Sequence, residues 1–80
     1  MTFNKWLDTF VSEKGLDLEQ MLLAEGPSGT NHIPVGCIID LMKQAPKNEQ
    51  RAIKDMIVRI DFRNGDVLHY FRHLAQAVAM

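Results

Sequence analysis

Two histidines near the C-terminus have the spacing of paired metal ligands on a helix. His69 and His73 lie four residues apart, so a helix would place both rings on one side. A zinc site needs a third and usually a fourth ligand, and Arg72 adds unfavourable positive charge beside the pair. His32, Cys37 and the carboxylates have no predicted position near these rings. We therefore predict two solvent-facing histidines, and expect neither a metal nor a cofactor.

Nucleophilic side chains are present, but the sequence shows no arrangement that would activate one of them. Cys37 occupies an apolar position of a predicted helix, where burial would suppress thiol reactivity. Ser28 lies close to His32, yet a flexible glycine-rich segment holds no catalytic geometry. The same segment, residues 26–32, lacks the Gly-Lys-Ser/Thr sequence of a phosphate-binding loop. We therefore expect no enzymatic activity and no small-molecule substrate.

The positive charge of the chain is concentrated in its C-terminal half. The 80-residue chain has a net charge of −1, but residues 1–42 carry −4 and residues 43–80 carry +3. One interpretation is that the two oppositely charged halves face each other, within the fold or across a dimer. The other is that the basic half contacts an acidic partner. Nucleic-acid binding is the alternative prediction for function. It would use basic side chains for phosphates and the polar face of the last predicted helix for bases: Lys47, Arg51, Lys54, Arg59, Arg63, His69, Arg72, His73 and Gln76.

Capping residues and apolar spacing divide the chain into the helices that must position these side chains. Thr2 can cap a first amphipathic helix that ends before Gly15. Asp17 can cap a short second helix, which Gly26 and the proline after it end. Residues 26–32 are rich in turn-forming residues, so they are predicted to be the one long loop. This loop is a connector whose length allows a partner-binding role.

Prolines and an aspartate mark the starts of three more predicted helices. Pro34 suits the first turn of a third helix, which is apolar on most sides and is therefore predicted to be buried among the others. A fourth helix is predicted to begin at Ala45 or Pro46, and Asp66 can cap a last helix. The predicted buried stripe of this last helix is Val67, Phe71, Leu74 and Val78.

The fourth segment has apolar side chains on two faces of the predicted helix. One face is formed by Ile53, Met56, Ile57 and Ile60. Val58 and Phe62 lie almost opposite, so another surface of the chain or a partner must cover them. Residues 58–70 also allow a small hairpin, because Asn64-Gly65 is a strong hairpin signal. We favour two helices, since Asn64-Gly65 equally suits a helix C-terminus.

These observations predict a single small helical domain over residues 1–80, an all-α compact bundle of four to five short helices. The alternative is an α+β fold with a small hairpin around Asn64-Gly65. A single cysteine and the lack of a signal-peptide or membrane-spanning run favour a cytoplasmic protein with no membrane contact. We expect a non-enzymatic protein–protein interaction or regulatory accessory module. Its predicted partner is a protein or a second copy of itself in a homodimer, bound through Val58 and Phe62.

Overall fold

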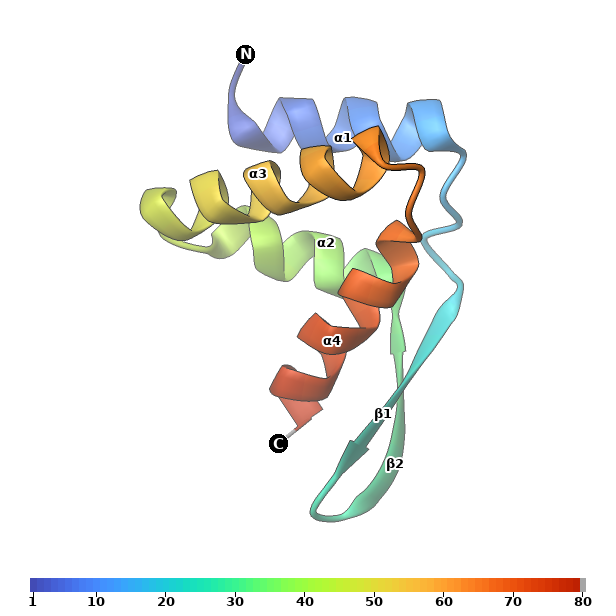
Figure 1. Cartoon of the computed structure of the whole chain (residues 1–80). Helices are drawn as coiled ribbons and strands as arrows, with labels where there is room; N and C mark the ends of the chain where they lie inside the picture. The colour runs from blue at the N-terminus through green and yellow to red at the C-terminus, as the bar shows by residue number, and fades with distance from the viewer. Residues whose placement is uncertain (80) are drawn as a thin grey trace.

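Four helices and one β-hairpin make up residues 1–79, the part of the chain that the computed structural model describes (Figure 1). In chain order they are α1 (Phe3–Lys14), β1 (Met21–Gly26), β2 (Gly29–Pro34), α2 (Val35–Gln44), α3 (Lys47–Phe62) and α4 (Val67–Ala79). The first three helices contact one another, and the hairpin extends away from them alongside α4 (Figure 1). The architecture is therefore α+β, with helices predominating, and not all-α.

The predicted short helix after Asp17 and the predicted loop over residues 26–32 are both wrong, because this region forms the hairpin. β1 pairs antiparallel with β2, and Gly26 lies opposite Gly29 at the turn. The side chains of β1 alternate between exposed and buried, which is the period of a strand and not of a helix. The Asp17 carboxylate accepts a hydrogen bond from the Glu19 amide and stabilises a turn.

The alternative hairpin around Asn64-Gly65 is wrong in its position, since this segment joins two helices as the favoured prediction stated. The Gly65 amide donates to the Ile60 carbonyl over 2.8 Å and ends α3. Asn64 has a left-handed φ of 56°, a conformation that asparagine tolerates at helix ends. Asp66 then caps α4, because its carboxylate accepts a hydrogen bond from the Leu68 amide at 2.9 Å.

The other predicted helix boundaries agree closely with the structure. Thr2 caps α1 through a hydrogen bond that its hydroxyl accepts from the Lys5 amide, and Gly15 ends the helix with a φ of 63°. Pro34 and Pro46 occupy the N-cap positions of α2 and α3, so both helices begin one residue after a proline. Local signals thus mark where the helices start: a side-chain cap for α1, and a proline without a side-chain capping hydrogen bond for α2 and α3.

One hydrophobic cluster contains side chains from all four helices and from the hairpin. As predicted, the third apolar segment is central, and its buried side chains are Val35, Ile38, Ile39 and Met42. The predicted stripe of α4 needs correction: Val67, Phe71 and Ala75 are buried, whereas Val78 is 54% exposed. The reason is that α4 packs mainly on β1. The side of α4 that faces inward is therefore not the side predicted for packing in an all-helical bundle.

A side-chain amide attaches the hairpin to α4. Gln76 Oε1 accepts a hydrogen bond from the Glu25 amide at 2.9 Å, and Gln76 Nε2 donates to the Glu25 carbonyl. Leu22 and Ala24 of the same strand are buried in the cluster that includes α4. Since both backbone groups of Glu25 bond to Gln76, α4 protects part of an edge that would otherwise be open.

Candidate interaction surface

The outer side of α3 carries two apolar side chains that the core of the described residues does not cover. Phe62 is 87% exposed and Val58 is 47% exposed. Ile57, on the inner side of the same helix, is completely buried. The two-faced helix predicted from the sequence is therefore present, but Met56, which was predicted on the inner face, is 39% exposed and lies at the edge of the outer one.

Charged and small side chains surround this apolar pair. We call the exposed side of the helix the outer face of α3, and its central residues are Ala52, Asp55, Met56, Val58, Arg59 and Phe62. A shallow groove runs along it between Lys54 and Phe62. Asp55 lies one helical turn from Arg51 on one side and from Arg59 on the other, so an acid sits between two bases.

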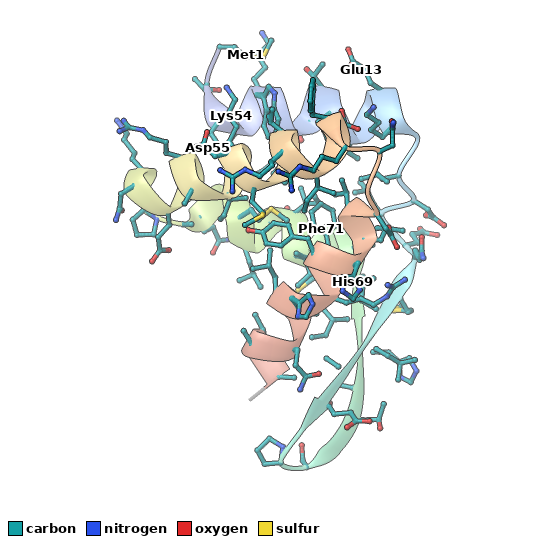
Figure 2. All side chains as sticks on the ribbon, viewed as in Figure 1. Met1, Glu13, Lys54, Asp55, His69 and Phe71 are labelled. Carbon is teal, nitrogen blue, oxygen red and sulfur yellow. The ribbon has the colours of Figure 1, made fainter. Side chains whose placement is uncertain are left out.

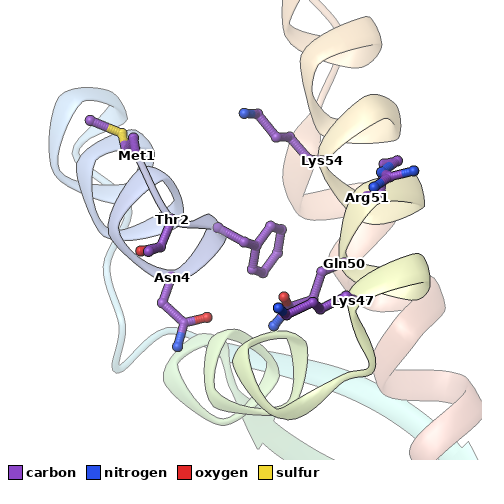
Figure 3. A pocket seen from close by; sticks show the side chains of 8 residues that line it. Met1, Thr2, Asn4, Lys47, Gln50, Arg51 and Lys54 are labelled. Atoms are coloured by element: carbon purple, nitrogen blue, oxygen red, sulfur yellow. The ribbon is translucent and has the colours of Figure 1, made fainter.

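A second hollow lies between the starts of α1 and α3 (Figure 3). We call it the basic cleft, a space of about 640 Å³ lined by Met1, Thr2, Phe3, Asn4, Lys47, Gln50, Arg51 and Lys54. Among the described residues 1–79, no carboxylate lines it. Lys54 extends toward α1, where its Nζ lies 5.2 Å from the centre of the Trp6 ring. The three basic residues were predicted from the sequence, but the α1 side of the cleft was not.

The remaining residues of the predicted nucleic-acid surface lie elsewhere. His69, on α4, is well separated in Figure 2 from Lys54, which lies in the cleft on α3. The oxygen and the nitrogen of the Gln76 side-chain amide are both hydrogen-bonded to Glu25 of the hairpin. The other members are distributed between the C-terminal end of α3 and the exposed side of α4: Arg59, Arg63, Arg72 and His73. Within residues 1–79, the cleft brings together Lys47, Arg51 and Lys54, and a separate place on α4 brings together His69 and His73.

The two histidines of α4 lie next to each other on its surface. Their Nε2 atoms are 3.2 Å apart, and the rings border a hollow with Ile60, Asp66 and Tyr70. Within residues 1–79, no group of three or more His, Cys, Asp or Glu side chains is placed to hold a metal ion.

Burial raises the pKa of Tyr70, so the folded state favours the neutral phenol. Its contribution to stability is therefore lost as the pH rises above the ordinary tyrosine pKa.

Cys37 is exposed on α2, so the prediction that burial suppresses its reactivity is wrong. The burial of this helix does not extend around its whole circumference, because Leu41 is also 40% exposed. We expect the native protein to react with a thiol-specific aromatic disulfide about as fast as the urea-unfolded chain, measured by absorbance of the released thiolate. Protection that disappears in urea would contradict the exposed position.

Comparisons of the chain with protein-family models, with curated proteins and with solved structures found no match. Among the helices of residues 1–79, none has the length and apolar character needed to cross a membrane. The fold and its surfaces define a small α+β protein with an uncovered apolar and charged helix face.

Proposed function

We propose that this protein is a non-enzymatic interaction module that self-associates through the outer face of α3. The observation that carries the proposal is Phe62, a large apolar side chain that is 87% exposed beside the half-exposed Val58. Covering apolar surface is favourable by about 25 cal/mol per Å². A partner surface that covers both side chains would therefore gain free energy that the folded monomer leaves unused.

The residue pattern of the outer face fits a second copy that runs antiparallel. Ala52, Asp55, Arg59 and Phe62 follow one another at spacings of three, four and three residues, the spacing of positions that face a partner helix. Two antiparallel copies of α3 related by a twofold axis set Asp55 of each against Arg59 of the other. In the same arrangement the large Phe62 faces the small Ala52.

The flanking positions are also compatible with this pairing. Met56 and Val58 each face their own counterpart across the twofold axis, and Glu49 faces Arg63. A parallel pair would instead place Asp55 against Asp55 and Arg59 against Arg59. Because like charges repel and opposite charges attract, the charge pattern selects the antiparallel dimer.

Replacing Phe62 with glutamate should abolish this association while the fold persists. A single pair of helices buries little surface, so we expect a weak dimer. The fraction of protein in the dimer should still be rising when the protein concentration reaches about 0.1 mM. Sedimentation equilibrium at several concentrations measures the average mass, and circular dichroism shows whether Phe62→Glu remains folded. An unfolded variant would show that Phe62 belongs to the core, which would remove the argument.

Reversal of the two facing charges provides a test that does not depend on losing an aromatic ring. Asp55→Arg and Arg59→Asp should each weaken the dimer, because each places like charges opposite one another. The double variant Asp55→Arg/Arg59→Asp restores opposite charges across the axis and should associate like the wild type. A monomeric wild type, or a double variant no better than the single variants, would overturn the proposal.

A further inference from the structure

The three cations of the basic cleft form a row along one side of α3. Lys47, Arg51 and Lys54 are spaced by four and three residues, so they share one side over about 10 Å of the helix axis. Within residues 1–79 none of them has a carboxylate at ion-pairing distance. The ion pairs that do form use other bases: Lys14, Lys43 and Arg72. The row therefore presents cations that form no ion pair with the described residues, and these are available to an anion.

The opposite wall of the cleft supplies an aromatic ring and polar groups. Phe3 is partly buried, and its ring centre lies 6.0 Å from that of Trp6. Asn4 lies on the same wall (Figure 3). The helices α1 and α3 both begin at this end of the molecule, so the positive ends of their dipoles add to the field (Figure 1).

We infer that the basic cleft binds single-stranded nucleic acid, with successive phosphates along the row Lys47, Arg51 and Lys54 and a base against Phe3. Proteins that bind single strands combine a positive groove for the backbone with aromatic rings on which bases stack. A run of Asp and Glu residues in an acidic peptide would also meet the cations, but it carries no aromatic ring to stack on Phe3. The inference is independent of the proposed dimer, because its three cations lie beside the outer face of α3 and are not among its central residues.

Binding can be measured with a fluorescein-labelled 12-nucleotide oligothymidylate at low salt. Fluorescence anisotropy should rise to saturation, and Trp6, the single tryptophan, should change its emission because Lys54 lies over its ring. The logarithm of the binding constant should fall with the logarithm of the salt concentration at a slope of about −2, since each of three neutralised phosphates contributes roughly −0.7.

Matched variants separate this site from general attraction to a basic surface. Lys47→Gln/Arg51→Gln should weaken binding at least tenfold and reduce the slope to about −0.7, the contribution of the one remaining cation. Phe3→Leu should weaken binding without changing the slope, because stacking is lost and charge is not. The control Arg63→Gln/Arg72→Gln removes the same charge outside the cleft and should bind like the wild type.

Several results would overturn the inference. They are no binding at low salt, equal weakening by the control variant, equal competition by polyglutamate, or equally tight binding of thymidine triphosphate. The third result would indicate an acidic protein partner and the fourth a free nucleotide. The variant Phe62→Glu should still bind the oligonucleotide, so failure of the dimer and failure of this site remain distinguishable.

Discussion

Replacing Phe71 with alanine should destabilise the protein by about 3–5 kcal/mol. Phe71 is completely buried in the cluster where α4 meets α2 and the hairpin, so losing its ring leaves a cavity that neighbours cannot fill without moving. A domain of 80 residues has a free energy of unfolding of about 4–12 kcal/mol, so this loss is a large share of the total. Urea unfolding followed by circular dichroism measures the difference.

The variant Phe62→Ala removes the same ring from the outer face of α3 and serves as the matched control. Because that ring is 87% exposed, the free energy of unfolding should change by no more than about 0.5 kcal/mol. The measurement belongs at low protein concentration, where a weak dimer dissociates. If Phe62→Ala costs as much as Phe71→Ala, the folded monomer covers Phe62, and the outer face is not free for a partner.

The helices could be predicted because their signals are local. The Thr2 hydroxyl, the left-handed Gly15 and the Asp66 carboxylate each act within a few residues of the helix end that they cap. The segment Asn64-Gly65 was ambiguous, since both a hairpin turn and a helix end use this dipeptide. The apolar residues that follow at helical spacing resolved it correctly.

The hairpin could not be predicted because its decisive contacts are distant in sequence. Met21, Leu22 and Leu23 form a continuous apolar run, and periodicity alone does not distinguish a short run of this kind in a strand from one in a helix. Its partner, β2, is mostly exposed and carries little apolar signal. What fixes the strands is packing on α4 and the bonds between Gln76 and Glu25, 51 residues apart.

The two candidate surfaces also differ in how far the sequence predicts them. Val58 and Phe62 were identified correctly as an exposed pair, because helical spacing within one segment determines which side chains oppose one another. The basic cleft requires the start of α1 beside the start of α3, a tertiary arrangement with no local signal. The spacing of four and three residues could have shown that Lys47, Arg51 and Lys54 share one side of a helix. It could not have shown that Phe3 and Asn4 lie opposite them.

The variant Leu22→Ala should cost about 2–5 kcal/mol, the range for a leucine removed from a packed interior. Leu22 is 1% exposed, whereas its neighbours Met21 and Leu23 are 55% and 59% exposed. Met21→Ala and Leu23→Ala should therefore change stability by no more than about 0.5 kcal/mol. A helix over these residues would instead bury Met21 together with Leu22, so a costly Met21→Ala would contradict the strand.

The shape of the unfolding transition of Leu22→Ala decides whether the hairpin is part of the cooperative unit. An isolated two-stranded hairpin is at best marginally stable in water, so this one depends on α4 for its order. Because Leu22 and Phe71 share one buried cluster, losing either should loosen the whole cluster. Trp6 emission, which reports on α1, should then give the same midpoint as circular dichroism. An earlier transition that Trp6 does not detect would show that the hairpin and α4 separate from the other helices first.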